Sequence, residues 1–234
     1  GNIYLGWTGK TPLSYELFKI LKNLKMNPVF IRKSYESFKD EINLLKQLGP
    51  VIEKRKRGLA LNEAIKNKYN IAILDDGFQD FSVKKDKSII CFNEKQWIGN
   101  GFIIPAGPLR EGMSALSRAD IVFINGEKNL EIENKLLSKN KLVKIFYSIY
   151  KPQNINEFIN KKVICFAGIG NPNNFFNLLK KNEIKISEKI IFPDHYKYSE
   201  KDIKNLINKA KEKNAILLTT EKDYLRIEER YKVN

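Results

Sequence analysis

The chain has 234 residues, of which 42% are hydrophobic and 29% are charged, a composition typical of a globular protein with one large or two small domains. No apolar run approaches the roughly 18 residues that a membrane-spanning helix requires. The formal net charge is +15, from 42 Lys and Arg against 27 Asp and Glu, so candidate partners include nucleic acid, an anionic membrane surface and an anionic small substrate. Lysine, asparagine and isoleucine are frequent throughout, so solvated surface accounts for this charge equally well.

The few histidine and cysteine residues argue against a zinc site. One histidine and two well-separated cysteines do not have the spacing of zinc ligands. Cys91 and Cys165 each stand inside an apolar run, so we expect buried free thiols on strands, as in a protein of a reducing compartment.

The first twelve residues have the layout of a phosphate-binding loop. A short apolar run, interpreted as a strand, ends in the turn Gly6-Trp7-Thr8-Gly9, and Lys10 and Thr11 open a stretch with helical spacing. In such a loop the backbone N–H groups face a phosphate, the lysine reaches the outer phosphates and the hydroxyl ligates Mg²⁺. Tyr4 stands where the standard spacing has a glycine. The alternative is a glycine turn before an ordinary helix, with Lys10 in solvent.

Apolar runs then alternate with helix-prone segments. We expect strands at residues 28–31, 50–52, 71–74, 88–92, 121–124, 163–167, 190–192 and 216–220. We expect helices after the phosphate loop, from residue 38, at 60–68, within 127–141, up to 179 and at 199–213, with Ser199 as an N-cap and a connector at 142–152. This order predicts an α/β protein with a mostly parallel sheet covered by helices, similar to P-loop NTPases. We place a core domain at residues 1–140 and a smaller α/β domain at 141–234.

Two adjacent acids follow one of the expected strands. Asp75 and Asp76 end the apolar run 71–74, where a phosphate-loop protein holds Mg²⁺ or its water shell. Parallel sheets bind ligands at the carboxyl ends of their strands, where Lys10 and Asn125 are also expected. Alone, Asp-Asp-Gly after a strand is more often a turn. The phosphate loop shifts the interpretation toward a metal site.

Six motifs, in order along nearly the whole chain, resemble those of the tetraacyldisaccharide 4′-kinase family of lipid A biosynthesis. They are the phosphate loop and residues 73–79, 99–111, 167–172, 192–195 and 220–223. The resemblance implies transfer of the γ-phosphate of ATP, with Mg²⁺, to the 4′-hydroxyl of a tetraacyldisaccharide 1-phosphate. The partners implied are this anionic glycolipid and the inner-membrane surface, and the protein would be peripheral on the cytoplasmic face.

Nucleotide and metal roles carry over by motif position. Residues 6–11, Gly6-Trp7-Thr8-Gly9-Lys10-Thr11, match the ATP-binding loop. Thr11, Asp75 and Asp76 match the magnesium site, and Glu111 resembles a further acid near the metal. Arg110 is a candidate second cation for the phosphates.

Catalytic roles are implied for Asp40, His195 and Lys10. Asp40 resembles the proposed base of a Gly-Asp-Glu-Pro element, although Lys39 and Ile42 stand at two of its four positions. A sugar hydroxyl needs such a base within hydrogen-bonding reach. His195, the only histidine, matches the residue proposed to act with Asp40, whereas by itself such a histidine is more often a packing or capping residue. The two residues belong to different expected domains, so domain closure would bring them together.

The chain departs from the family pattern at its start. Trp7 replaces what is usually a glycine, and a membrane-associating segment that precedes the loop in the family is absent, so we expect an N-terminally truncated member. The basic run Lys54-Arg55-Lys56-Arg57 is either a contact for anionic lipid or a solvated loop.

The leading hypothesis is a monomeric, membrane-peripheral lipid kinase with no nucleic-acid partner. Two alternatives stay open at this point. One is a P-loop kinase or NTPase with another acceptor. The other is a catalytically degenerate, membrane-associated nucleotide-binding protein, which Trp7 and the missing segment would favour.

Overall fold

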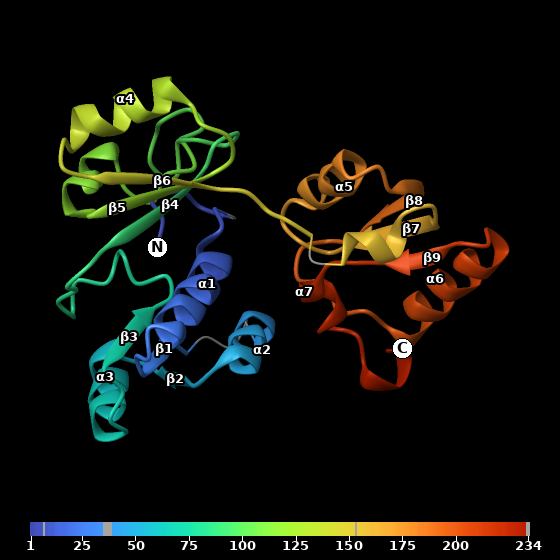
Figure 1. Cartoon of the computed structure of the whole chain (residues 1–234), viewed down its shortest axis with the longest axis horizontal. Coiled ribbons are helices and arrows are strands. Elements are labelled where there is room, and N and C mark those ends of the chain that lie inside the picture. The colour runs from blue at the N-terminus through green and yellow to red at the C-terminus, as the bar shows by residue number, and fades with distance from the viewer. Residues whose placement is uncertain (7, 35–38, 153, 233–234) are drawn as a thin grey trace. The chain divides into compact units, whose positions relative to one another are not determined.

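The chain folds into two compact units, Gly1–Ile149 and Tyr150–Asn234. A computed structural model describes residues 1–6, 8–34, 39–152 and 154–232, without the side chains of residues 39–41 and 43. Both units contain parallel strands covered by helices, which confirms the α/β class (Figure 1). The strands form three separate three-stranded sheets within the described part of the chain, two in the first unit and one in the second.

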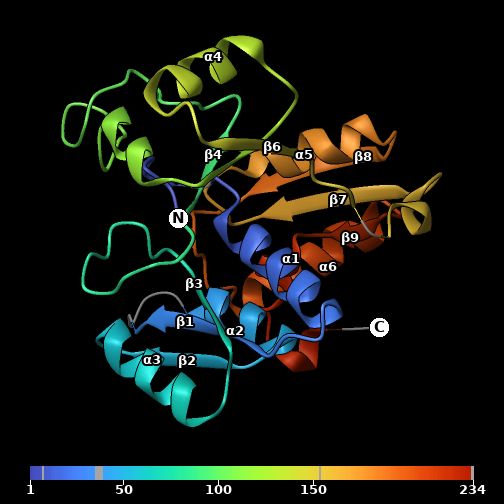
Figure 2. The same ribbon diagram turned by 60° about the vertical axis from the view of Figure 1, so that its left-hand side comes forward.

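The first sheet is covered by helices on both faces. Its strands are ordered β2-β1-β3. The elements are α1 (Lys10–Asn23), β1 (Pro28–Lys33), α2 (Lys39–Leu48), β2 (Val51–Lys54), α3 (Arg57–Lys66) and β3 (Ile71–Leu74). Val29 and Ile31 of β1 pack with α3, whereas Phe30 packs with Phe18 of α1 and Leu45 of α2. The ribbons of these helices and strands can be followed in Figure 1 and Figure 2. Alternate residues of β1 therefore face opposite helices, which explains its continuous apolar sequence.

The second sheet includes a strand in the expected connector. Its order is β4-β5-β6. The elements are β4 (Ile89–Asn93), η1 (Met113–Arg118), β5 (Ile121–Asn125), α4 (Leu130–Lys139) and β6 (Lys144–Ser148). β6 pairs in parallel with β5 and alternates exposed with half-buried residues. The connector prediction is wrong here because the apolar run of this edge strand, Ile145-Phe146-Tyr147, is short and stands between Lys144 and Ser148. For the same reason the second unit begins at Tyr150, whereas the sequence places this boundary at residue 141.

The expected first strand is reduced to one residue of pairing. The Gly1 amino group donates to the Ile89 carbonyl, the Cys91 N–H donates to the Gly1 carbonyl, and both distances are 2.9 Å, the pattern of a parallel ladder. The chain then leaves β4, and Tyr4 forms an isolated antiparallel bridge with Leu109.

The second unit is a helix-covered sheet ordered β8-β7-β9. The elements are η2 (Ile155–Phe158), β7 (Lys162–Ala167), α5 (Pro172–Lys181), β8 (Lys185–Ile191), α6 (Glu200–Glu212), β9 (Ile216–Leu218), α7 (Glu221–Tyr224) and η3 (Glu229–Tyr231). Val163 and Cys165 of β7 pack with α5, whereas Phe166 packs with α6. Ser199 caps α6 in a capping box with Asp202, so its predicted role is confirmed.

The two cysteines are buried and free, as predicted. Cys91 lies on β4 and Cys165 on β7. Burial raises the pKa of the Cys165 thiol to about 12.

Candidate active site

The glycine-bounded turn leads into α1. Gly6 and Gly9 have φ angles of 119° and 92°, a region that favours glycine. Gly9 immediately precedes α1 and has no side chain with which to cap it, and the first turn of α1 contains no acidic residue. No carboxylate within the first turn of α1 therefore offsets the partial positive charge of this helix N-terminus. Lys10 and Thr11 are the first two residues of the helix, and both are half-buried.

A buried asparagine holds the turn in place through side-chain hydrogen bonds. The Asn2 side-chain amide donates to the Tyr4 carbonyl at 2.6 Å, to the Gly6 carbonyl at 3.2 Å and to Thr8 Oγ1 at 3.0 Å. Asn2 is fully buried, and its backbone carbonyl accepts a hydrogen bond from Nε2 of Gln79 at 2.7 Å. Asn2 thereby ties the turn to the segment after β3. The role of Asn2 was not predicted from the sequence, because only its tertiary contacts reveal it.

The two carboxylates that follow β3 have different partners. Asp75 is buried, accepts from Ser14 Oγ at 3.4 Å and lies 3.6 Å from Arg32 Nε. Asp76 has a φ of 52° and pairs with Lys10 Nζ at 3.0 Å. The guanidinium of Arg110 donates to both oxygens of Asp76, at 3.1 and 3.0 Å.

The charges around Asp76 control its ionisation. Burial raises the pKa of this carboxyl group, but the positive charges of Lys10 and Arg110 outweigh burial and lower the pKa to about 2. Asp76 is therefore ionised at neutral pH. Lys10 and Arg110, the two cations expected near the phosphates, thus converge on one carboxylate at the N-terminus of α1.

Arg57 supports this centre from α3. Its Nη2 donates to the backbone carbonyls of Asp75 and Asp76, at 3.1 and 2.9 Å, and its Nη1 pairs with Asp80 at 2.8 Å. Arg57 is buried, and Lys54 pairs with Glu63 at 2.7 Å. The basic run 54–57 is therefore not a uniform solvated or lipid-facing loop, because its last member holds the turn that carries the acids.

Glu111 is held apart from the two aspartates. Its Oε2 accepts from Arg118 of η1 at 2.6 Å. In the described residues, no three His, Cys, Asp or Glu side chains are grouped as a metal site. The structure thus does not gather Asp75, Asp76 and Glu111 into one ligand set. Mg²⁺ is commonly bound by one or two carboxylates together with substrate phosphates, and Asp75, Asp76 and the Thr11 hydroxyl fit that pattern.

Two predicted residues lie partly or wholly outside the described part of the chain. Asp40 belongs to α2, but its side chain is not described, and Trp7 is not described at all.

In the second unit, three of the recognised motifs meet at the turn after β7. Asp223 lies at the end of the motif 220–223, is fully buried and accepts from the Gly168 N–H at 3.0 Å. The His195 N–H donates to the Gly168 carbonyl at 3.1 Å and to Asp194 Oδ1 at 2.9 Å. Arg226 Nη1 donates to the same Gly168 carbonyl at 2.7 Å. His195 therefore lies in a fixed turn. The sequence motifs alone predicted no role for Asp223 or Arg226.

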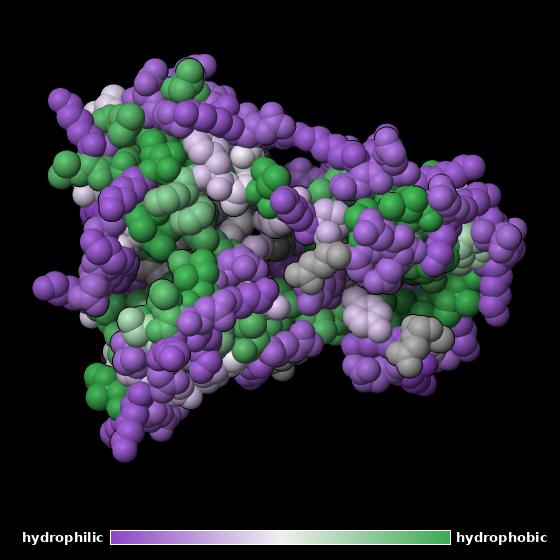
Figure 3. Space-filling model, viewed as in Figure 1, coloured by the Kyte–Doolittle hydropathy of each residue, from purple (hydrophilic) through white to green (hydrophobic). Residues whose placement is uncertain are grey.

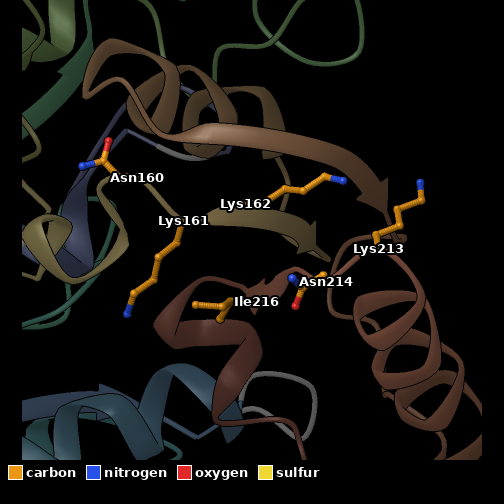
Figure 4. Close-up of a pocket in the computed structure, with 6 residues that line it drawn as sticks. All are labelled: Asn160, Lys161, Lys162, Lys213, Asn214 and Ile216. Carbon is orange, nitrogen blue, oxygen red and sulfur yellow. The ribbon is translucent and has the colours of Figure 1, made fainter.

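A basic pocket of about 470 Å³ opens at the other end of this sheet (Figure 4). It is lined by Asn160, Lys161, Lys162, Lys213, Asn214 and Ile216. Lys161 and Lys162 point in different directions, and Lys213 pairs with Glu188 at 2.6 Å. This pocket lies where β7 and β9 begin, so it is separate from the turn that carries His195.

Comparison with known proteins places these features in a family. The family model described as tetraacyldisaccharide-1-P 4′-kinase matches residues 1–234. The tetraacyldisaccharide 4′-kinase of Pelagibacter ubique is 44% identical, over 97% of this chain and 74% of that protein. The enzyme of the same name from Rickettsia bellii is 38% identical, over 97% of this chain and 75% of that protein.

A solved structure agrees with these relatives. The crystal structure of LpxK from Aquifex aeolicus in complex with ATP has a TM-score of 0.72 and 25% sequence identity, and the match covers 98% of this chain and 78% of that one. The similarity therefore extends over both units and all six motifs rather than over the phosphate loop alone. Because the family model matches the full length of the chain, the chain belongs to the tetraacyldisaccharide-1-P 4′-kinase family.

Proposed function

We infer that this chain is an ATP-dependent kinase that phosphorylates the 4′-hydroxyl of a tetraacyldisaccharide 1-phosphate, a lipid A precursor. The observation that carries this inference is the convergence of Lys10 and Arg110 on Asp76 at the N-terminus of α1. The family match over residues 1–234 supports the acceptor.

Phosphoryl transfer needs positioning and charge neutralisation more than covalent chemistry. The N-terminus of α1 and the turn that Asn2 supports would bind the nucleotide phosphates, with Lys10 and Arg110 as the cations. Mg²⁺ would be held by Thr11 and by Asp75 or Asp76, and would neutralise charge on the phosphates. Glu111 remains a candidate for a further acid near the metal, although it is ion-paired with Arg118.

The acceptor hydroxyl requires a base. Asp40 fills this role in our proposal and His195 acts with it, because Asp75 and Asp76 are committed to cations. Support comes from the position of each residue in its motif and from the fixed turn that carries His195.

The lipid substrate suggests contact with a membrane surface, at the cytoplasmic face of the inner membrane. In the described part of the chain, no helix combines the length and apolarity needed to span a bilayer. Leu5, Phe102, Ile103 and Ile104 are 48–62% exposed, and backbone hydrogen bonds connect their segments through Pro108 and Leu109. Figure 3 shows hydrophobic side chains among hydrophilic ones on the surface of the first unit. These apolar side chains and the net charge of +15 favour an anionic, lipid-containing surface. We propose that the protein acts there as a monomer.

Vesicle sedimentation tests this surface. We expect binding to anionic vesicles that weakens as salt is added, and little binding to neutral ones. Replacement of Phe102 and Ile103 by serine should weaken binding at a fixed lipid charge, whereas serine at Leu142, which is 90% exposed, should not. Equal binding to neutral and anionic vesicles at low salt would refute the electrostatic part of the proposal.

Phosphate transfer from radiolabelled ATP tests the enzymatic proposal. The tetraacyldisaccharide 1-phosphate should become labelled, and a matched acceptor without the 4′-hydroxyl should not. Labelling of an unrelated alcohol in preference to this acceptor would identify a different kinase. Nucleotide binding without transfer to any acceptor would indicate a protein that binds nucleotide but is not a kinase.

A further inference from the structure

The buried carboxylate of Asp223 is the centre of a hydrogen-bond network in the second unit. Besides the Gly168 N–H, its Oδ1 accepts from the Tyr198 hydroxyl at 2.9 Å and lies 3.1 Å from Arg226 Nη1. Its Oδ2 accepts from Thr220 Oγ1 at 2.7 Å. Burial and the neighbouring Asp223 carboxylate raise the pKa of Tyr198, so this hydroxyl remains a donor. A buried carboxylate with this many donors has a fixed position.

Arg226 connects this carboxylate to the imidazole of His195. Its Nη1 contacts both Asp223 and the Gly168 carbonyl, which leaves little rotational freedom for the planar guanidinium. Its Nη2 lies 3.5 Å from Nδ1 of His195. The side chain of Arg226 is 8% exposed and that of His195 is 29% exposed, so the contact is partly buried.

The chemistry of the two groups specifies where the imidazole proton lies. A guanidinium has only donors, so a neutral imidazole that faces it at Nδ1 must accept there and carry its proton on Nε2. On the other side of the ring, Asp194 Oδ1 lies 3.9 Å from Nε2. A carboxylate near Nε2 favours a proton on that nitrogen, so both neighbours select the same tautomer.

We propose that Arg226, held in place by Asp223, is a positioning residue that orients His195 and keeps its neutral ring in the Nε2–H form. This tautomer cannot take a proton at Nε2, but it can donate from Nε2 to a carboxylate or to an acceptor oxygen. Under the proposed function, on which this step rests, the Nε2–H group of His195 is the one with which it acts beside the base. The tautomer itself does not depend on which reaction the protein catalyses.

The single histidine permits a direct test. Because His195 is the only histidine of the chain, every imidazole signal in a spectrum of ¹⁵N-labelled protein belongs to it, provided that the affinity tag contains no histidine. At a pH that leaves the ring neutral, we expect an unprotonated Nδ1 and a protonated Nε2. A protonated Nδ1 in the unmodified protein would overturn the proposal by itself.

Variants of Arg226 separate positioning from mere structural support. Arg226→Lys keeps the charge beside Asp223 but cannot also contact Gly168 and His195 with a planar fork. In both Arg226→Lys and Arg226→Met, the two ring-nitrogen signals should move toward each other as the tautomers mix. Turnover should fall at least about tenfold, with a KM for ATP that changes less than about twofold. Arg230→Lys is the matched control, because Arg230 is 60% exposed and pairs with surface glutamates.

The outcomes distinguish this proposal from the proposed function. Unchanged ring-nitrogen signals in folded Arg226→Lys, or an equal change in the Arg230→Lys control, would refute positioning by Arg226. If Arg226→Met does not fold, the unmodified protein and Arg226→Lys still decide the question. If the signals change as expected while His195→Ala retains full turnover, Arg226 positions the ring but the catalytic role of His195 is wrong.

Discussion

The two units contain charged centres that are built differently. In the first, Asp76 forms ion pairs with both Lys10 and Arg110. The side chain of Asp76 is 31% exposed, and those of Lys10 and Arg110 are 16% and 26% exposed. In the second, Asp223 is fully buried, and its partner Arg226 is 8% exposed. The first centre is accessible to a ligand, and the second is closed to water by its own partners.

This difference indicates two kinds of task. Cations that contact a partly exposed carboxylate can turn to the phosphates of a nucleotide without leaving a buried charge unpaired. A carboxylate that accepts from Gly168 and Tyr198 inside the protein cannot change partners at a comparable cost. We therefore assign ligand charge neutralisation to the first centre and preorganisation of the His195 turn to the second.

The largest effect should come from removing the buried charge of the second unit. Asp223→Asn removes the charge that balances Arg226 and weakens the bond to the Gly168 N–H, so the second unit should lose about 3–5 kcal/mol of stability. Hydrogen exchange of peptides that contain Gly168 measures this loss locally. Asp202→Asn, at the exposed capping box of α6, should cost only about 0.5–2 kcal/mol. Equal losses for both variants would contradict the distinction between the two centres.

The next largest effect concerns catalysis at the open centre. Lys10→Ala should lower turnover about 100- to 1,000-fold, which corresponds to about 3–4 kcal/mol of transition-state stabilisation. The melting temperature should hardly change, because the Lys10 side chain forms an ion pair and does not belong to a hydrophobic cluster. Lys19→Ala on the same helix removes a surface pair with Glu16 and should leave turnover unchanged. Normal turnover in Lys10→Ala would refute the nucleotide site.

A third experiment asks whether the two units contribute to one catalytic step. If Asp40 and His195 act as a unit, Asp40→Ala and His195→Ala should each lower kcat about 100-fold or more, with a smaller effect on the KM for ATP. The double variant should then be little worse than the more damaging single one. Fully multiplicative losses would separate the residues and leave His195 as a structural member of its turn.

Much of the fold follows from local sequence patterns. β1, β4, β5 and β7 were predicted because their burial produces continuous apolar runs. β6 was missed because its apolar run is only three residues long and is flanked by Lys144 and Ser148. The first half of β8 was missed because polar residues interrupt it, and both strands lie at the edges of their sheets. The division of the first unit into two sheets depends on long-range pairing, which no local pattern contains.

The candidate site divides in the same way. Lys10, Thr11 and the pair Asp75-Asp76 could be predicted as site residues because a short motif carries their chemistry. The role of Arg32 was not predicted. Ile31 of β1 pairs with Leu74 of β3, so the next residues of these segments, Arg32 and Asp75, lie next to each other. Asn2, Arg57 and Arg226 were missed for the same reason, since their roles arise only when distant segments pack together.

The smallest predicted effect is a pH dependence specific to the open centre. The pKa of Asp76 in the folded protein is lowered from 3.8 to about 2, because the charges of Lys10 and Arg110 outweigh the effect of burial. Below about pH 4 the unfolded chain therefore binds a proton that the folded chain does not, so stability must fall as the pH falls toward about 2. A shift of this size corresponds to at most about 2 kcal/mol, and partial exposure of the side chain reduces it to about 1 kcal/mol.

The matched variant isolates this contribution. Both tryptophans belong to the first unit, so their fluorescence follows urea unfolding of that unit. The difference in unfolding free energy between the unmodified protein and Asp76→Asn should be largest above about pH 5 and should shrink toward about pH 2. Asp80, whose pKa is also lowered by hydrogen bonds from Ser82 and Arg57, is present in both proteins, so its contribution cancels. Added salt should reduce the difference, because the pair is partly exposed. A difference that does not change with pH would show that Lys10 and Arg110 do not hold Asp76 ionised, and the open centre would then lose the charge pairing on which its assignment depends.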